Sequence, residues 1–138
     1  PSKDKAIMIS SGGTKEKVAM LDGARMLTQA GYTIYASEGT AQFLNDNGAK
    51  AIAVSWPDED KPGMENVMKM IAEHKFDLVV NIPKNRTSRE LTNGYKIRRA
   101  AIDHNIPLIT NARLASAFIE AFCTLSVEDL SIKSWNEY

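Results

Sequence analysis

The sequence predicts an α/β fold, a three-layer sandwich in which helices cover both faces of a five-stranded parallel sheet. Two observations carry this prediction. Five short apolar runs recur along the 138 residues, and a stretch with helical spacing of its apolar residues follows each of them. This alternation is typical of βαβ units. The five runs are also apolar without interruption, which is expected of strands that are buried on both faces.

The expected strands are rich in aliphatic and β-branched residues and end at turn-forming residues. The last strand starts at Pro107, where proline removes no hydrogen bond from the middle of the sheet. We expect strands at 6–9, 32–36, 51–54, 77–81 and 107–110.

The expected helices follow the strands in order. Thr14 is a suitable N-cap for the first helix, and Gly31 ends it because glycine readily adopts the left-handed conformation that follows a helix. Asn111 is a candidate N-cap for the last helix. We expect helices at 14–30, 39–47, 64–74, 93–104 and from 112 onward, with polar loops at 55–63 and 82–92.

Length and composition restrict the function. A chain of 138 residues fits one domain, residues 1–138, and its 17 basic and 17 acidic side chains cancel. A neutral chain has no field to hold duplex nucleic acid, so nucleic acid is not an expected partner. The single cysteine, Cys123, excludes an intramolecular disulfide and fits a reducing compartment such as the cytoplasm. No apolar run approaches the ~18–20 residues of a membrane span, so no membrane contact is expected.

The N-terminus has neither an initiator methionine nor the apolar segment of a signal peptide, so we expect a processed chain or a piece cut from a longer one. Residues 126–138 lack a helical period and are expected to form a C-terminal tail.

In parallel sheets the loops that follow the strands meet at the carboxyl edge, where ligands bind. The first such loop, 10–15, contains Gly12 and Gly13, whose backbone N–H groups can approach a ligand, and then Lys15 at a helix N-terminus. This combination suits an anion, although it lacks the spacing of a P-loop. A turn that leaves Lys15 in solvent is the alternative.

Two further loops add polar groups of the same kind. Ser37 and Thr40 can direct their hydroxyls at one ligand, or Ser37 can simply cap the helix that follows. The loop after the fourth strand carries two side-chain amides and three cations, namely Asn81, Asn85, Lys84, Arg86 and Arg89. Loops of matching chemistry that converge on one edge favour a ligand site over a solvated surface.

Several other residues are more typical of a structural role than of catalysis or metal binding. Trp56 can stack on a ligand or close the edge of the core, and we favour the core. His74 and His104 have no partners at metal spacing, and the basic stretch 96–99 is either a solvated face or a contact with another domain. No Ser–His–Asp or Cys–His set can be assembled, and carboxylates gather only at 58–60 on an exposed stretch. The sequence therefore predicts a binding site without catalytic residues, metal or cofactor.

Four segments resemble one known family. They are YASEGTA at 35–41, DLVVN at 77–81, YKIRRAA at 95–101 and IPLITN at 106–111. They are similar to the methylglyoxal-synthase-like (MGS-like) domain that ends the large chain of carbamoyl-phosphate synthase, and the resemblance extends over about 6–121. It implies a Rossmann-type fold and an allosteric role, with no catalytic residues in this domain.

The resemblance also implies a parent enzyme. That parent is a glutamine-hydrolysing, ATP-dependent ligase that uses Mg or Mn and supplies pyrimidine or arginine biosynthesis in the cytoplasm. The implied partners are the remainder of its large chain, its glutaminase small subunit and a small effector, and a homo-oligomer fits the resemblance. Effectors in the family are nucleotide monophosphates such as UMP and IMP, or an acylglutamate.

We expect effector contacts from eight residues, seven from the resemblance and Arg86 from the charge of its loop, whose side chains are hydroxyls, amides, cations and one indole. They are Lys15, Ser37, Thr40, Trp56, Asn81, Lys84, Arg86 and Asn93. The three cations favour a phosphate, so a nucleotide monophosphate is the expected effector. Trp56 and Asn81 are similar to the acylglutamate pattern, but Lys84 stands where that pattern has an asparagine, and Asn93 or Gly94 matches its last asparagine only loosely.

A methylglyoxal synthase-type lyase is the alternative function. Such an enzyme eliminates phosphate from dihydroxyacetone phosphate and needs a carboxylate base beside the phosphate. Its histidine corresponds to Ser10 and its aspartates align with about Met64 and Lys84, so the base is missing. A flavodoxin-like flavin protein is a third reading, which the chemistry of the loops disfavours.

Overall fold

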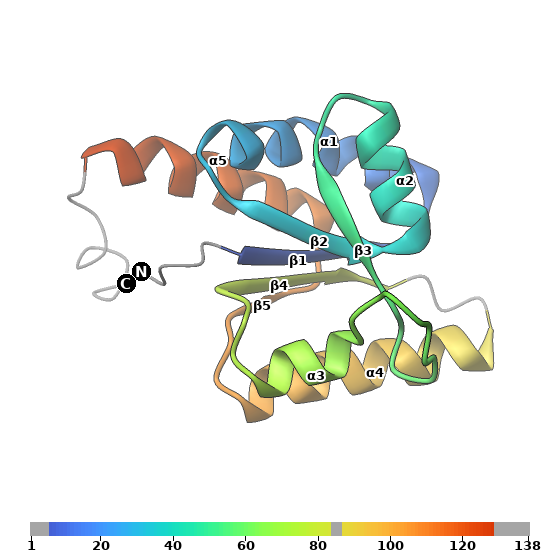
Figure 1. Cartoon of the computed structure of the whole chain (residues 1–138). Helices are drawn as coiled ribbons and strands as arrows, with labels where there is room; N and C mark the ends of the chain where they lie inside the picture. Colours follow the sequence, from blue (N-terminus) through green and yellow to red (C-terminus); the bar gives the residue numbers. More distant parts are fainter. Residues whose placement is uncertain (1–5, 84–86, 129–138) are drawn as a thin grey trace.

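The computed structural model describes residues 6–83 and 87–128. Within these ranges, five parallel strands form one sheet and five helices alternate with them (Figure 1). The strands are β1 (Ala6–Ser11), β2 (Thr33–Ser37), β3 (Ala51–Val54), β4 (Leu78–Ile82) and β5 (Leu108–Ile109). The helices are α1 (Thr14–Gln29), α2 (Glu38–Asp46), α3 (Val67–Ala72), α4 (Ser88–Asp103) and α5 (Ala112–Glu128). This architecture confirms the α/β fold class that the sequence predicts.

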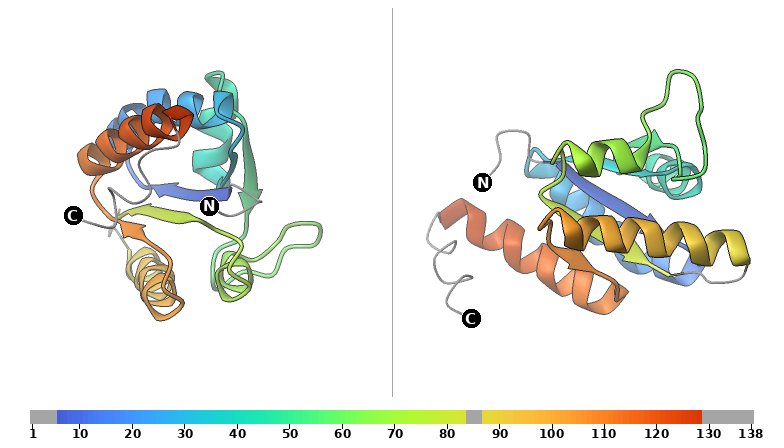
Figure 2. Two further views of the ribbon diagram at one scale, coloured as in Figure 1. Left: turned by 90° about the vertical axis from the view of Figure 1, so that its left-hand side faces the viewer. Right: turned by 90° about the horizontal axis from the view of Figure 1, so that it is seen from below.

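Both faces of the sheet are buried because alternate side chains of the central strands enter different cores. In β1, Ile7 and Ile9 belong to a cluster with side chains of α1, α2 and α5. Ala6 and Met8 belong to a second cluster with side chains of α3 and α4. Figures 1 and 2 show the same division into three layers. Full burial of a large apolar side chain contributes about 1.5–3 kcal/mol, and this requirement on both faces explains the uninterrupted apolar runs.

The strand order β3-β2-β1-β4-β5 determines where a site can form. From β1 the chain moves outward through α1 and α2 to β3, and it then crosses back through α3 to β4 on the other side of β1. The loop after β1 therefore enters a helix on one face of the sheet, and the loop after β4 enters a helix on the other face. Because these two loops diverge, a crevice is expected at the carboxyl ends of β1 and β4.

The fourth helix begins earlier than the sequence pattern indicates. α4 starts at Ser88 rather than at 93, because Thr87 and Glu90 form a capping box. The Glu90 N–H donates to Thr87 Oγ1 at 3.1 Å, and the Thr87 N–H donates to Glu90 Oε1 at 3.0 Å. The predicted basic loop at 82–92 is therefore wrong in its second half, and Arg89 is a helical residue.

Of the two predictions for the ends of α1, the one for the N-terminus is wrong and the one for the C-terminus is confirmed. Gly13, not Thr14, occupies the N-cap position, and no side chain caps this end of the helix. The prediction for Thr14 is therefore wrong. Gly31 follows the helix with φ of +91°, a conformation that glycine adopts without strain, so the prediction for Gly31 is confirmed.

The last helix is longer than expected. The Leu114 N–H donates to Asn111 Oδ1 at 2.9 Å, which confirms the predicted cap. α5 then continues to Glu128, so the first three residues of the predicted tail, 126–138, are helical. The rest of that tail lies outside the described residues.

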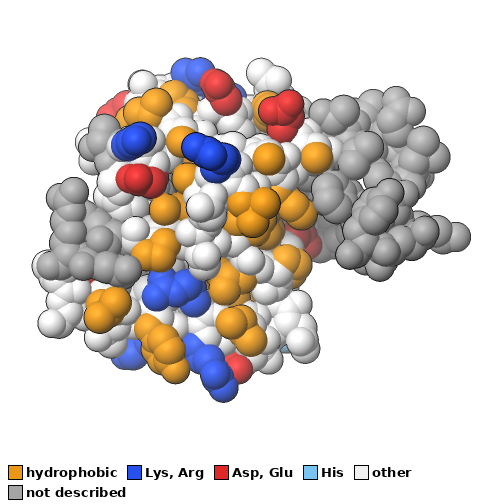
Figure 3. Space-filling model, turned by 180° about the vertical axis from the view of Figure 1, so that it is seen from behind, with side chains coloured by type: hydrophobic (Ala, Val, Ile, Leu, Met, Phe, Trp, Pro, Cys, Tyr) orange, Lys and Arg blue, Asp and Glu red, His pale blue; other side chains and the backbone are white. Residues whose placement is uncertain are grey.

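Several large apolar side chains of α4 are exposed. Leu91, Tyr95 and Ile102 are 52%, 61% and 60% exposed, and their spacing places them on one face of the helix. α4 and α5 lie at the back of the molecule (Figure 2), and Figure 3 shows apolar side chains interspersed with Lys and Arg on that side. These exposed groups do not make a membrane span, because no helix in the described ranges is both long and apolar enough to cross a bilayer.

Candidate functional site

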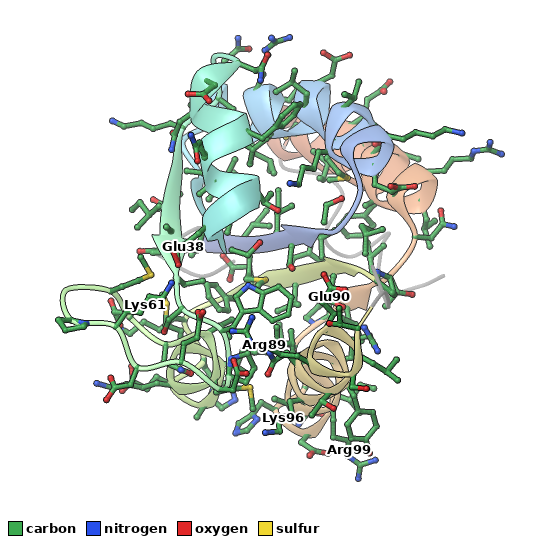
Figure 4. The ribbon with its side chains drawn as sticks, turned by 90° about the vertical axis from the view of Figure 1, so that its right-hand side faces the viewer. Glu38, Lys61, Arg89, Glu90, Lys96 and Arg99 are labelled. Atoms are coloured by element: carbon green, nitrogen blue, oxygen red, sulfur yellow. The ribbon has the colours of Figure 1, made fainter. Side chains whose placement is uncertain are left out.

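A pocket of about 240 Å³ lies at the crevice between the carboxyl ends of β1 and β4. Its walls come from the ends of β1 and β4, Lys17 of α1, the start of α2, α4 as far as Arg98, and the β3–α3 loop, residues 55–66. Figure 4 looks onto this edge of the sheet. The pocket therefore joins the segments that follow four of the five strands, as expected for a parallel sheet.

Three hydroxyl-bearing residues join β1 to α2 at the pocket. Thr40 Oγ1 donates to the Ser11 carbonyl at 3.1 Å and accepts from the Ser11 N–H at 3.3 Å. The Ser37 hydroxyl donates to Thr40 Oγ1 at 3.1 Å, and all three residues are buried. Ser37 occupies the N-cap position of α2, but its hydroxyl bonds to no N–H group of the helix. Simple capping therefore does not describe Ser37, and the structure brings it together with Thr40.

Ser11 carries a polar atom without a partner. Its Oγ is buried and is the one buried side-chain oxygen or nitrogen in the described part of the chain that makes no hydrogen bond. An unpaired buried hydroxyl costs about 1–3 kcal/mol. Because Ser11 lines the pocket, a ligand bound there can supply the missing hydrogen bond. The sequence places Ser11 in the first loop, but no sequence pattern marks an unpaired hydroxyl.

Lys17, rather than Lys15, reaches the pocket. Lys15 is exposed and lies outside the pocket wall, whereas Lys17 forms part of it. The Lys17 Nζ lies 3.5 Å from the position that a Cβ would take at Gly39, in the first turn of α2. A helix turns by about 100° per residue, so Lys17 lies on the same side of α1 as the buried Met20 and Ala24, and Lys15 does not. This spacing is the sequence signal that favours Lys17.

Arg98 reaches the pocket from α4 and holds Asn81. Its Nη1 donates to Asn81 Oδ1 at 2.7 Å, and Asn81 is buried. Gly94, one turn earlier, leaves space for this contact, because a Cβ there would lie 2.8 Å from Arg98 Nη1. The interpretation of Arg98 as a solvated or domain-contact residue is therefore wrong. Its charge meets a neutral amide oxygen, and no carboxylate in the described ranges pairs with it.

Trp56 lines the pocket and belongs to neither core cluster. Its backbone is held on both sides. The Trp56 N–H donates to Glu59 Oε1, and its carbonyl accepts from Asn66 Nδ2, both at 2.9 Å. Its place in the wall differs from the core position that the sequence favours, and it allows the indole to stack on a planar ligand group.

The acidic stretch of the β3–α3 loop pairs with α4. Arg89 Nε donates to Asp58 Oδ2 at 2.7 Å, and Arg89 Nη2 donates to Asp58 Oδ1 at 3.1 Å and to Glu59 Oε2 at 3.0 Å. Asn93 Nδ2 also donates to Asp58 Oδ1, at 3.1 Å, so this amide contacts the loop and is not part of the pocket wall. Asp58 and Asp60 are exposed, as the sequence predicts, and Glu59 is partly buried. The early start of α4 presents Arg89 to Asp58 and Glu59, a contact that the sequence analysis does not predict.

These contacts lower the pKa of both carboxyl groups. The hydrogen bond from Arg89 is the largest cause for the pKa of Asp58. The hydrogen bond from the Trp56 N–H is the largest cause for the pKa of Glu59, and Arg89 lowers it further. A carboxyl group whose pKa is lowered on folding stabilises the fold above its unfolded pKa of about 4. That contribution is lost as the pH falls through the folded pKa.

Acidification should therefore reduce the free energy of unfolding less when the two carboxylates are removed. The free energy of unfolding, measured with urea, should fall between about pH 7 and about pH 3 by a smaller amount in the Asp58→Asn/Glu59→Gln variant than in the wild type. The effect is small because Asp58 and the partner of both carboxylates, Arg89, are exposed. Asp60→Asn is the control, since Asp60 is in the same loop but pairs with no described residue. Equal differences in the wild type and the double variant would contradict the assignment.

Every carboxylate in the described pocket wall is already engaged. Glu38 pairs with Lys61, Glu59 pairs with Arg89, and Glu90 caps α4. The wall therefore offers hydroxyls, helix N–H groups, Lys17 and Arg98 to a ligand, without a free carboxylate to take a proton from it. Such a set can hold a small anion.

The remaining candidates lie elsewhere. Two predicted contacts, Lys84 and Arg86, lie outside the described residues. The histidines meet at the opposite edge of the sheet, where α3 and α4 end, with His74 Nε2 3.1 Å from the His104 carbonyl oxygen and ring centroids 5.5 Å apart. Across residues 6–83 and 87–128, no group of three or more His, Cys, Asp or Glu side chains could hold a metal ion.

Comparison with known families and sequences gives one consistent result. The family model described as "MGS-like domain" matches residues 19–110. The "Multifunctional protein CAD" of Squalus acanthias is 39% identical over 129 residues, which covers 85% of this chain and 6% of that protein. The "Carbamoyl phosphate synthase large chain, C-terminal section" of Methanocaldococcus jannaschii is 36% identical over 123 residues, covering 89% and 19%. The human "Carbamoyl-phosphate synthase [ammonia], mitochondrial" is 37% identical over 100 residues, covering 71% and 7%. The chain thus spans less than a fifth of the length of each of these relatives.

Solved structures share the fold at low sequence identity. A methylglyoxal synthase from Elizabethkingia anophelis superposes with a TM-score of 0.54 at 14% identity, covering 83% of this chain and 76% of that one. The protein ForH superposes with a TM-score of 0.58, also at 14% identity, covering 86% and 79%. At this level of identity the likeness concerns the fold alone.

Proposed function

The chain belongs to the MGS-like domain family, and we propose that it is the effector-binding regulatory domain of a carbamoyl-phosphate synthase large chain. The pocket at the carboxyl ends of β1 and β4 binds the effector, a small anion. The observation that carries this proposal is the buried, unpaired Ser11 Oγ in the pocket wall, next to the start of α2 and within a site that also contains Lys17. A buried hydroxyl without a partner favours a bound ligand that completes its hydrogen bonding.

The chemistry of the pocket suits a phosphate. The N-terminus of α2 presents backbone N–H groups, Gly39 leaves them accessible, and the Lys17 ammonium lies over the same turn. Trp56 on the β3–α3 loop can stack on a base, and Asn81 and Arg98 can bind oxygen atoms of the ligand. A nucleotide monophosphate such as UMP or IMP fits this arrangement, with an acylglutamate as the alternative anion.

The rest of the proposal concerns the parent protein. The relatives are many times longer than this chain, so we place the catalysis in other parts of the synthase, a glutamine-hydrolysing ligase that uses ATP with Mg or Mn. The exposed apolar face of α4 at Leu91, Tyr95 and Ile102 suits docking onto the remainder of the large chain. The glutaminase small subunit, a homo-oligomeric state and a cytoplasmic location are parts of the same proposal.

Calorimetric titration of the chain with UMP, IMP, N-acetylglutamate and ornithine tests the proposal. We expect a nucleotide monophosphate to bind. Ser11→Ala should weaken its affinity about 2- to 15-fold, which is the fold-change that corresponds to the loss of one hydrogen bond. Ser11→Ala should leave the free energy of unfolding unchanged or raise it, because the hydroxyl has no partner in the fold. Ser116→Ala is the control, since Ser116 Oγ donates to the Ala19 carbonyl at 2.9 Å away from the pocket.

Two outcomes would argue against this function. Binding of none of the four compounds would leave the pocket without a regulatory ligand. Turnover of dihydroxyacetone phosphate above the uncatalysed rate would support the lyase instead, and one of the engaged carboxylates would then have to act as the base.

A further inference from the structure

The β3–α3 loop is tied to both sides of the pocket. Lys61 pairs with Glu38 at the start of α2, and Asp58 and Glu59 pair with Arg89 at the start of α4. α2 and α4 lie on opposite faces of the sheet (Figure 1), so a loop bonded to both of them must cross the carboxyl edge where the pocket lies. Figure 4 shows Lys61 beside Glu38, with Arg89 between the loop and α4.

The loop is also braced internally. Asn66 Nδ2 donates to the carbonyls of Trp56 and Glu59, each at 2.9 Å. The Trp56 N–H donates to Glu59 Oε1, and the Glu59 N–H donates to the Trp56 carbonyl at 3.0 Å. These bonds fix the turn that carries Asp58, so a defined backbone presents the two carboxylates to Arg89.

Arg89 lies in the pocket wall, but its charge is paired with carboxylates of the β3–α3 loop. Two carboxylates bind one guanidinium through Nε and Nη2, and Nη1 makes no hydrogen bond to a described residue. A ligand phosphate or carboxylate would bind the same forked set of donors, because its oxygens match that geometry. Asp58 and Glu59 therefore occupy the place on Arg89 that a ligand anion would take.

We propose that Asp58 and Glu59 are a built-in competitor for the effector anion at Arg89. An anion that binds Arg89 displaces the two carboxylates and releases the β3–α3 loop from α4. This inference rests on the proposed function, because the competing anion is the effector. The Arg89 and Asp58 side chains are 57% and 36% accessible, and that of Glu59 is 20% accessible. Solvent screens the Arg89–Asp58 pair and keeps it weak, so an incoming anion can replace it. Release frees the Asp58 end of the loop from α4 while Lys61 still holds the loop at Glu38, which converts occupancy of the pocket into a change at the surface of the domain.

Two matched variants test the competition. Asp58→Asn and Asp60→Asn each remove one negative charge from the same loop, but only Asp58 contacts Arg89. UMP and inorganic phosphate are titrated into the wild type and both variants. We expect Asp58→Asn to bind about 2- to 5-fold more tightly than the wild type, and Asp60→Asn to bind as the wild type does.

Hydrogen exchange gives a second readout that does not depend on affinity. The amides of Trp56 and Glu59 should exchange faster in unliganded Asp58→Asn than in the wild type, and faster in the wild type when UMP is saturating. If Asp58→Asn and Asp60→Asn bind UMP more tightly than the wild type by the same factor, the effect comes from the net charge of the loop and the proposal is overturned. Weaker binding by Asp58→Asn would overturn it too, because the carboxylate would then support Arg89.

The two proposals fail in different ways. If UMP binds the wild type, Ser11→Ala weakens it, and Asp58→Asn neither tightens it nor speeds exchange, then the competition is refuted and the proposed function stands. If neither UMP nor phosphate binds any variant, both are refuted.

Discussion

Thr40→Val should destabilise the protein by about 2–4 kcal/mol, because the Thr40 hydroxyl is the centre of a buried network. Oγ1 donates to the Ser11 carbonyl and accepts from the Ser11 N–H and the Ser37 hydroxyl, and Thr40 is 1% exposed. Valine has nearly the same shape and no hydroxyl, so it leaves two buried donors without their acceptor. Thermal unfolding should show a decrease in Tm on the order of 10 °C.

The same variant should lose effector binding. Thr40 holds the end of β1 against the first turn of α2, and both segments form the pocket wall. Thr28→Val is the matched control, because the Thr28 hydroxyl donates to the Ala24 carbonyl within one helix, at 3.0 Å. Thr40→Ser keeps the hydroxyl and should restore most of the stability. If Thr28→Val and Thr40→Val are equally destabilising, the buried network around Thr40 contributes no more to the free energy of unfolding than one side-chain hydrogen bond within a helix.

Lys17→Ala should weaken binding of a nucleotide monophosphate about 10- to 100-fold, the value of a hydrogen bond to a charged group. The Lys17 ammonium lies over the first turn of α2, whose residues line the pocket and whose first N–H groups have no partner within the helix. No carboxylate in the described ranges pairs with it, so its charge is available to a ligand. Calorimetry at two salt concentrations should also show a weaker salt dependence in the variant, because one ionic contact is lost.

Lys15→Ala is the control within the same helix. It removes the same charge two residues earlier, from an exposed position outside the pocket wall. We expect an affinity close to that of the wild type and no change in the free energy of unfolding. A loss on Lys15→Ala as large as that on Lys17→Ala would place the ligand nearer to the start of α1 than the pocket implies.

These predictions concern a pocket whose charges are largely balanced internally. Arg89 is bound to carboxylates, and Lys61 from outside the wall neutralises Glu38. Of the described cations in the wall, Lys17 and Arg98 are the ones that no carboxylate pairs. The sequence suggests a loop dominated by cations, since three of the residues 84–89 are basic and the others are uncharged. Acidic side chains about 30 residues away neutralise Arg89, so selectivity in this site depends on fewer charges than the sequence indicates.

Several features of the site could be predicted because they follow from local pattern and sheet topology. Parallel strands place all their carboxyl ends at one edge, so residues directly after strands must gather there whatever the details of packing. Ser37, Thr40, Trp56 and Asn81 are all found in the pocket wall for this reason.

Other features could not be predicted because they depend on the direction of a side chain or on the path of a loop. Helical spacing places Lys17 rather than Lys15 on the buried side of α1, but the position of its ammonium over the first turn of α2 depends on how the two helices pack on the sheet. Arg98 reaches Asn81 because Gly94 leaves space on α4. The contact between Asp58 and Arg89 depends on how the β3–α3 loop folds back across the edge.

From the sequence alone, the alternation of apolar runs determined the three layers, the parallel sheet and the edge at which a ligand can bind, because these depend on short-range periodicity and on burying both faces. Only the tertiary structure decided which charges remain available at that edge. A salt bridge or an unpaired hydroxyl depends on distances of a few ångströms between segments far apart in the chain, and residue spacing carries no information about those distances.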